Sequence, residues 1–306
     1  MKRSSDGGVH GVRAISRAGS GGAHAPAAYV QLATAVLVAA ATMSAAGVAS
    51  AATSGFASHR AIYDLKLEKT RGGRQLEAVR GRILYDFSGS RCEGYDLQMR
   101  QVSELDSGEG RNAVTDLRST SWEDGAARSF RFNSESRMND RTVDMVSGTA
   151  KRSDKRVDVS LTKPKSATFQ IPPRAVFPTE HMRRIIEAAQ SGKTLLDVPT
   201  YDGTDTGRKV YNTLTVIGRP LAPDERKPDD ASARLPELAG MTRWPVTISY
   251  FDRDKADRTG EQMPTYTLQF ELFENGISRA LILDYQDFVV SGELTSLELR
   301  KQKPCK

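Results

Sequence analysis

The sequence has few of the residues from which catalytic and metal sites are usually built. Its 306 residues include two Cys and four His, and Phe, Trp and Tyr together make up 7%. His10 and His24 lie in a polar leader, which leaves His59 and His181 for the folded part of the chain. Structural zinc sites take four Cys or His ligands. The sequence therefore does not predict a zinc site, and no cofactor or metal is expected.

Enzyme motifs are also scarce. There is no G-x-S-x-G nucleophile elbow. Gly192-Lys193-Thr194 ends like a phosphate-binding loop, but Glu187 stands where that loop needs a glycine. We interpret this tripeptide as the end of a helix. Asp205-Thr206-Gly207 matches the aspartic protease tripeptide, which works in pairs; the chain has no second copy, so a polar turn is expected.

Long hydrophobic runs are limited to the amino terminus. Lys2, Arg3, Arg13 and Arg17 precede an apolar stretch from about residue 27 to 46, and Ala49-Ser50-Ala51 follows it. A basic region, a hydrophobic region and an A-x-A site in this order are typical of a secretory signal. We predict a signal peptide over 1–51 and a single β-rich periplasmic domain over 52–306, which does not span the membrane once the signal is cleaved. An uncleaved anchor is the alternative, although the stretch is rich in Ala rather than Leu.

The chain also lacks a one-sided charge. Its formal net charge is +6, but the first 51 residues hold four Lys or Arg and one Asp and thus carry half of it. In the remainder both signs are interspersed, as in 151–156. Nucleic-acid binding needs clustered positive charge, so no nucleic-acid partner is expected.

Alternation of apolar and polar residues dominates the mature chain. Ala61, Tyr63 and Leu65 alternate with charged residues, and period-two alternation indicates antiparallel strands with one buried face. Similar runs recur around 83–87, 95–99, 111–122, 128–138, 141–149, 155–162, 208–218, 244–252, 264–273, 277–289 and 293–301. Gly72-Gly73 and Asn275-Gly276 are typical of hairpin turns. We expect eleven to thirteen strands.

One segment has helical spacing. After the prolines at 172, 173 and 178, apolar residues recur at 182, 185, 186 and 189, with Thr179 as the expected N-cap and Gly192 as the end. Residues 219–240 are expected to form a long loop. The predicted fold is all-β with one main helix: a single large antiparallel sheet curled into an open barrel.

The two cysteines, Cys92 and Cys305, both lie in the predicted exported part. An oxidising compartment favours a disulfide, and two cysteines allow one intramolecular pair. It would close a loop of about 214 residues, for which the chain-entropy relation gives about 5 kcal/mol as an upper figure. A redox-active thiol and two free thiols remain as alternatives.

Several segments together resemble the EipB family of alphaproteobacterial periplasmic proteins. They are SHRAIYDL (58–65), GRILYDFSGSRCEGYDLQMRQ (81–101), FPTEHMRRIIEAAQSG (177–192) and YDGTDTGRKVYNTLTVIG (201–218), with Cys305 near the end. The resemblance implies a spiral-like open β-barrel whose disulfide joins the positions of Cys92 and Cys305. It also implies a non-enzymatic role in cell-envelope integrity and stress resistance, with a periplasmic helical-repeat (TPR) protein as partner.

The sequence leaves three functions to consider. The first is a non-catalytic periplasmic protein that maintains envelope integrity by binding an envelope protein. The second is a carrier of a lipid or lipoprotein acyl chain in a cavity lined by residues such as Phe130, Tyr266 and Phe270. The third, least favoured, is an envelope hydrolase that uses Asp202 and Asp205.

Overall fold

The computed structural model of the protein describes residues 55–71, 76–108, 110, 112–225, 229–253 and 262–301. These residues belong to one compact unit, Ala51–Lys306. The predicted signal peptide, the Gly72-Gly73 turn and Cys305 lie outside the described residues, so their assignments stay predictions. No helix in the described part of the chain is long and apolar enough to cross a membrane.

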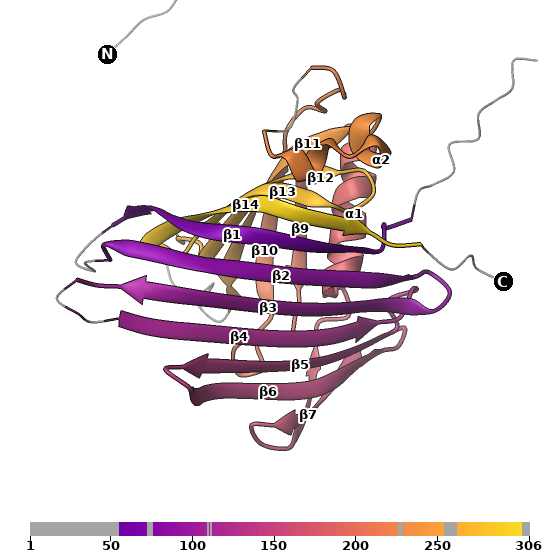
Figure 1. Cartoon of the computed structure of the whole chain (residues 1–306). Helices are drawn as coiled ribbons and strands as arrows, with labels where there is room; N and C mark the ends of the chain where they lie inside the picture. Colours follow the sequence, from indigo (N-terminus) through magenta and orange to yellow (C-terminus); the bar gives the residue numbers. More distant parts are fainter. Residues whose placement is uncertain are drawn as a thin grey trace, which may run out of the picture. The chain divides into compact units, whose positions relative to one another are not determined.

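A single sheet dominates the fold (Figure 1). Its order in the described residues is β8-β7-β6-β5-β4-β3-β2-β1-β14-β13-β12-β11-β10-β9. The first and last strands of the chain, β1 and β14, therefore pair at its middle, and each half continues outward through antiparallel neighbours. The strands are β1 (His59–Thr70), β2 (Ala78–Ser90), β3 (Gly94–Asp106), β4 (Asn112–Glu123), β5 (Ser129–Met138), β6 (Arg141–Arg152), β7 (Val157–Lys163), β8 (Ala167–Ile171), β9 (Leu195–Thr200), β10 (Tyr211–Ile217), β11 (Arg243–Asp252), β12 (Tyr266–Phe273), β13 (Ser278–Asp284) and β14 (Phe288–Leu299).

The sheet curls but does not close through a continuous pairing of its two edge strands, β8 and β9. Instead the segment after β8 touches the end of β9. The Val176 N–H donates to the Pro199 carbonyl at 2.8 Å, and the Tyr201 N–H donates to the Val176 carbonyl at 2.9 Å. The predicted open, curled antiparallel sheet is confirmed. The sequence missed β8 and β9, which are short.

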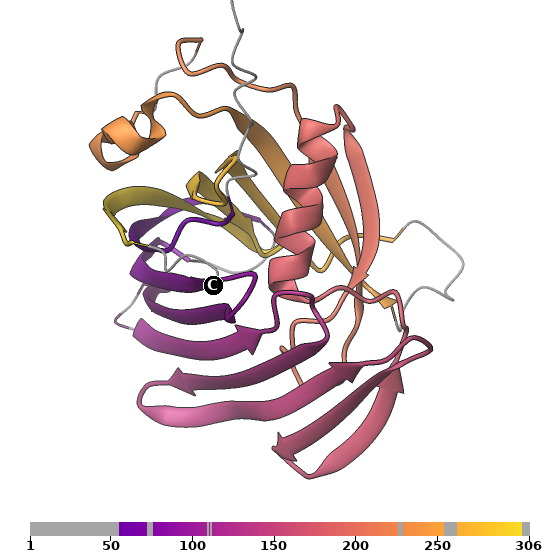
Figure 2. The same ribbon diagram turned by 90° about the vertical axis from the view of Figure 1, so that its right-hand side faces the viewer.

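Helix α1 (Pro178–Gln190) lies inside the curve of the sheet, as Figure 2 shows. Its predicted end is confirmed: Gly192 has φ of 73°, its N–H donates to the Ala189 carbonyl, and the Lys193 N–H donates to the Ala188 carbonyl. This geometry explains the Gly192-Lys193-Thr194 tripeptide as a helix terminus.

The predicted N-cap, Thr179, is wrong. The N-cap residue is Phe177, two residues before Thr179, so the helix begins at Pro178, and no side chain of the segment caps it. Glu123 at the end of β4 does so instead, because its carboxylate accepts the N–H of Thr179 at 2.7 Å and of Glu180 at 2.8 Å. A carboxylate from a distant strand thus satisfies donors that a helix start leaves unpaired.

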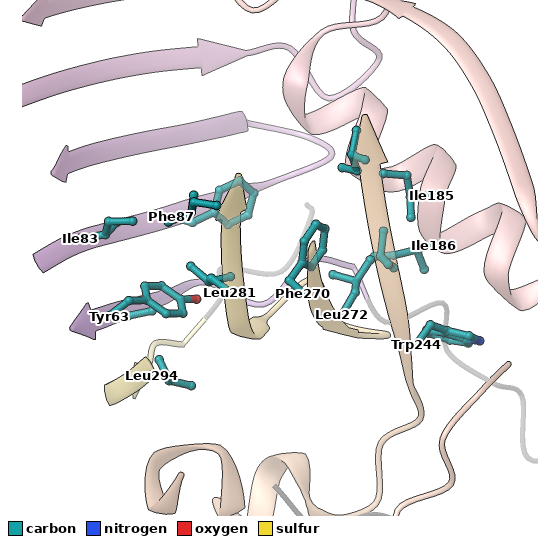
Figure 3. Close-up of a cluster of buried hydrophobic side chains, with 14 of the residues drawn as sticks. Tyr63, Ile83, Phe87, Ile185, Ile186, Trp244, Phe270, Leu272, Leu281 and Leu294 are labelled. Atoms are coloured by element: carbon teal, nitrogen blue, oxygen red, sulfur yellow. The ribbon is translucent and has the colours of Figure 1, made fainter. Parts of the chain in front are cut away.

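The apolar faces of the strands form two main clusters. In the larger one (Figure 3), Tyr63, Ile83 and Phe87 from the first half of the sheet meet side chains of the second half and of α1. The smaller one joins β5, β6 and β7 to the segment before α1 and is centred on Phe130 and Phe177. The apolar residues whose alternation predicted the strands are therefore the ones that are buried on the inner face of the sheet.

The long loop after β10 contains two short helices, η1 (Ala231–Arg234) and α2 (Pro236–Ala239). Leu238 of α2 packs in a small apolar cluster with Phe273, the last residue of β12, and Ile277. Leu221 and Arg243 pair across the base of this segment through both backbone hydrogen bonds. The segment predicted as a loop is therefore partly helical and held at its base.

Candidate functional site: an interior cavity beside the helix

A cavity of about 220 Å³ lies between α1 and the inner faces of both halves of the sheet. Strands β2 and β3 contribute to one wall, β11 and β12 to another, and α1 to a third. The apolar and aromatic side chains that line it are Phe56, Tyr85, Phe87, Leu97, Met182, Ile248, Tyr250 and Leu268; the polar ones include His59, Ser121, His181, Thr200 and Asp202. An apolar lining with a few convergent polar groups is typical of small-ligand sites.

A row of aromatic rings continues from this cavity across the second half of the sheet. The ring centroids of Tyr211 and Tyr250 are 6.0 Å apart, those of Tyr250 and Tyr266 5.6 Å, and those of Tyr266 and Tyr285 5.2 Å. Burial raises the pKa of the Tyr250 and Tyr266 phenols above the ordinary value, so both remain uncharged. The row therefore offers an apolar surface with neutral hydroxyl groups.

His59 and His181 both line this cavity, which the sequence did not indicate. The ring nitrogens of His181 lie 3.5 Å from the Thr200 hydroxyl and 3.4 Å from the Thr213 hydroxyl, and burial lowers its pKa to about 4. The Nδ1 of His59 lies 2.8 Å from the Ala57 carbonyl oxygen, and burial lowers its pKa as well. Both rings are therefore neutral near pH 7.

No cluster of three or more His, Cys, Asp or Glu that could hold a metal is present in the residues that the structure describes. The His181 imidazole thus lies beside two hydroxyl groups at the outer limit of hydrogen-bond distance, whereas the His59 imidazole contacts a backbone carbonyl oxygen.

Asp202 and Asp205 lie in the turn between β9 and β10, as predicted, but they make separate contacts. The Asp202 carboxylate accepts hydrogen bonds from the backbone N–H and hydroxyl of Thr204, at 2.9 and 2.7 Å, and burial raises its pKa. Asp205 is exposed, accepts the Tyr211 hydroxyl and lies 3.5 Å from the Lys209 ammonium. The predicted polar turn is confirmed.

The predicted cavity lining needs correction. Phe130 is fully buried in the smaller core cluster, where its ring stacks on Phe132 at 5.3 Å and on Phe177 at 5.2 Å. Phe270 is buried in the larger cluster. Tyr266 keeps some exposure and belongs to the aromatic row, but it does not line this cavity either. The alternation along the strands predicts that these side chains point inward. It does not predict whether other residues pack over them and separate them from the cavity.

Cys92 lies in the exposed turn between β2 and β3. Its predicted partner, Cys305, is outside the described residues, so their pairing stays a prediction.

The fold and the cavity together define an open β-barrel-like protein with a mostly apolar interior cavity. Comparison with solved structures agrees: a crystal structure of a beta-barrel-like protein from Brucella abortus has a TM-score of 0.73 and 34% identity, and the match covers 81% of this chain and 99% of that one. The model of the EipB-like family matches residues 50–301, so the chain belongs to this family.

A curated relative is the cell envelope integrity protein EipB of Brucella abortus (strain 2308). It is 37% identical over 255 residues, which are 83% of this chain and 88% of the relative. The resemblance found in the sequence is thereby confirmed, and the homology supports a role in the integrity of the cell envelope.

Proposed function

We propose that this protein maintains the cell envelope from the periplasm as a non-catalytic binding protein, and that its interior cavity receives an apolar segment such as an acyl chain of a lipid or lipoprotein. The observation that carries the proposal is the cavity itself. Tyr85, Tyr250 and Leu268 line it from opposite halves of the sheet, so a bound chain would contact both halves.

The size of the cavity limits what enters it. Its volume of about 220 Å³ is below the roughly 300–1,000 Å³ of typical small-molecule sites. The cavity is therefore suited to one segment of an acyl chain rather than to a whole lipid, and the remainder would stay outside. Each methylene group transferred from water into such a site contributes about 0.8 kcal/mol.

The polar groups of the cavity support a non-catalytic role. A general base works best with a pKa near the operating pH, whereas burial lowers the pKa of His181 to about 4. Asp202 and Asp205 have separate hydrogen-bond partners. The double variant Asp202→Ala, Asp205→Ala is therefore expected to keep wild-type resistance in an envelope-stress assay, which would exclude the hydrolase. Because Asp202 also lines the cavity, only loss of resistance in a folded double variant that still binds lipid would support the hydrolase.

Native mass spectrometry of the protein taken from the periplasm of the organism that encodes it tests acyl-chain binding. We expect lipid adducts on the wild type and on Val114→Trp, a control at an exposed position of β4. Leu268→Trp, which places an indole in the cavity, is expected to lose them while keeping the wild-type circular dichroism spectrum. No adduct on the wild type, or equal adducts on both variants, would contradict the proposal.

A protein partner is the second candidate, and a different surface favours it. Leu195 on the edge strand β9 lies opposite Val216 on β10, and their exposed fractions are 59% and 46%; Leu214 nearby is 38% exposed. Exposed apolar groups beside a sheet edge are typical of partner binding. The helical-repeat protein implied by the resemblance is the candidate partner.

Co-purification from the periplasm tests this second candidate. The variant Val216→Glu is expected to lose the partner, and Val143→Glu on β6, at a position that is 60% exposed, is the matched control. Retention of the same partner by Val216→Glu would exclude this surface.

A further inference from the structure

A hollow of about 410 Å³ lies on the outer face of the sheet, over β3, β4, β5 and β6, and is called the outer groove below. Its volume is within the range of small-molecule sites. Two rows of side chains that cross the strands line it, and the side chains between the rows point to the other face. Of these, Phe132 is buried in the smaller core cluster, and Leu97 and Ser121 line the interior cavity. The floor of the groove is therefore sheet backbone, and the two rows are its walls.

The strand register builds both walls. On β3, β4 and β5 the first wall consists of the cross-strand neighbours Asp96, Trp122 and Arg131, and the second consists of Gln98, Thr120 and Asn133. The walls are two residues apart along each strand and thus about 7 Å apart, and each crosses strands that are spaced by about 4.8 Å. The groove is thus a trough that runs across the strands.

The second wall carries neutral hydrogen-bonding groups. The side chains of Gln98, Thr120 and Asn133 are exposed and make no hydrogen bond to another residue in the described part of the chain. Elsewhere on the same face polar side chains pair with one another, as Arg100 does with Asp116. An amide group and a hydroxyl group can each donate and accept. The second wall therefore presents three adjacent neutral groups that are free to bind a ligand.

The first wall holds a guanidinium in a fixed position. The Arg131 Cζ lies 4.3 Å from the centroid of the Trp122 ring, which is a cation–π contact. The Trp122 Nε1 in turn donates to the Glu93 carbonyl at 3.3 Å. Arg131 has no ion-pair partner among the described residues, so its donors are available. Because Asp96 carries one negative charge on the same wall, the groove has no net charge.

We infer that the outer groove binds a neutral oligosaccharide. The sugar chain crosses the strands, and its hydroxyl groups exchange hydrogen bonds with Gln98, Thr120 and Asn133 and accept from Arg131. An apolar chain would leave these groups unpaired. An extended peptide would instead pair its backbone with a sheet edge. The interior cavity lies on the opposite face of β3 and β4, so this inference goes beyond the proposed function.

Calorimetric titration of the protein with chitohexaose and with cellohexaose, two neutral β-linked oligosaccharides, tests the inference. N-acetylglucosamine is the control for chain length. An alginate hexasaccharide, in which every sugar carries a carboxylate, is the control for charge. We expect saturable binding of at least one neutral hexasaccharide, and at least tenfold tighter binding than that of either control, because contacts along the groove require a chain.

Two variants locate the binding. The double variant Gln98→Ala, Asn133→Ala removes both amides, and Thr120→Trp places an indole in the groove. Both are expected to weaken oligosaccharide binding at least tenfold. Gln170→Ala, at an exposed amide of β8, and Val114→Trp, at an exposed position of β4, are the matched controls and should bind as the wild type does. All five positions are exposed, so each variant is expected to keep the wild-type circular dichroism spectrum.

Absence of saturable binding of both neutral hexasaccharides would overturn the inference. Tighter binding of the alginate hexasaccharide, or unchanged affinity in Thr120→Trp, would do the same. The interior-cavity variant Leu268→Trp should bind the oligosaccharide normally, and Thr120→Trp should keep the lipid adducts of the wild type. The failure of either proposal therefore leaves the other standing. Loss of oligosaccharide binding in Leu268→Trp but not in Thr120→Trp would place the sugar in the interior cavity and refute this inference.

Discussion

Two buried groups at the start of α1 should respond to pH in opposite directions. Burial raises the pKa of Glu123 from the ordinary 4.5 to about 7, against the lowering effect of its backbone hydrogen bonds to Thr179 and Glu180. Burial lowers the pKa of His181 from 6.5 to about 4. Both side chains are almost fully buried, at 3% and 4% exposure, so the two shifts bear directly on the free energy of unfolding.

The two groups change the free energy of unfolding with opposite dependence on pH. Glu123 is protonated at a higher pH in the folded protein than in the unfolded chain, whereas His181 is protonated at a lower pH in the folded protein. The stability contributed by the Glu123 shift is full below pH 4.5 and is lost as the pH rises through 7. The contribution of His181 is full above pH 6.5 and is lost as the pH falls through 4. Each shift spans about 2.5 pH units, which corresponds to about 3 kcal/mol. Between pH 4.5 and 6.5 the two effects should nearly cancel.

Single substitutions should reveal each effect. In Glu123→Gln only the histidine effect remains, so the free energy of unfolding is expected to fall by about 3 kcal/mol, relative to the wild type, as the pH is lowered from 7 to 4.5. In His181→Gln it is expected to rise relative to the wild type over the same range, by a similar amount.

Urea unfolding followed by the fluorescence of the chain's two tryptophans measures these differences. Glu187→Gln, at an exposed position of the same helix, is the matched control and should run parallel to the wild type. If the curves of Glu123→Gln and His181→Gln also run parallel to that of the wild type, the reasoning about these two groups is refuted.

Two further predictions concern the backbone and the cysteines. Gly203→Ala should destabilise the protein by about 1–3 kcal/mol more than Gly192→Ala in urea unfolding. Both glycines have φ of 73°, but only at Gly203 would the added Cβ meet the Phe132 ring, at 2.4 Å. Equal losses of stability in the two variants would mean that the Phe132 ring moves aside for the added methyl group. Peptide mapping under non-reducing conditions should find Cys92 joined to Cys305 in periplasmic protein, and recovery of two free thiols would disprove the disulfide.

Local patterns predicted most of the fold. Ala61, Tyr63 and Leu65 are buried as their alternation requires. Strand β9 was missed because it is six residues long and contains Pro199, which lacks an N–H. The strand tolerates this proline because β9 is an edge strand of the sheet in the described residues, and the Pro199 carbonyl still accepts the Val176 N–H.

The sites could not be read from local patterns in the same way. Glu123 caps a helix that begins 55 residues later in the chain, and no spacing rule connects the two. His59 and His181 share a cavity only because the two halves of the sheet curve around α1. In the sequence, Gln98, Thr120 and Asn133 resemble ordinary polar strand residues, and only the pairing of β3, β4 and β5 brings them together. Such contacts depend on the three-dimensional arrangement of segments that are far apart in sequence.

The proposed role of the interior cavity in envelope integrity can be tested directly in cells. A strain that lacks the gene is complemented with the wild type, Leu268→Trp or Val114→Trp, and all three proteins must reach equal levels in the periplasm. We expect the wild type and Val114→Trp to restore resistance to detergent and to cell-wall antibiotics, whereas Leu268→Trp should not. Full restoration by Leu268→Trp would show that the cavity does not serve envelope integrity.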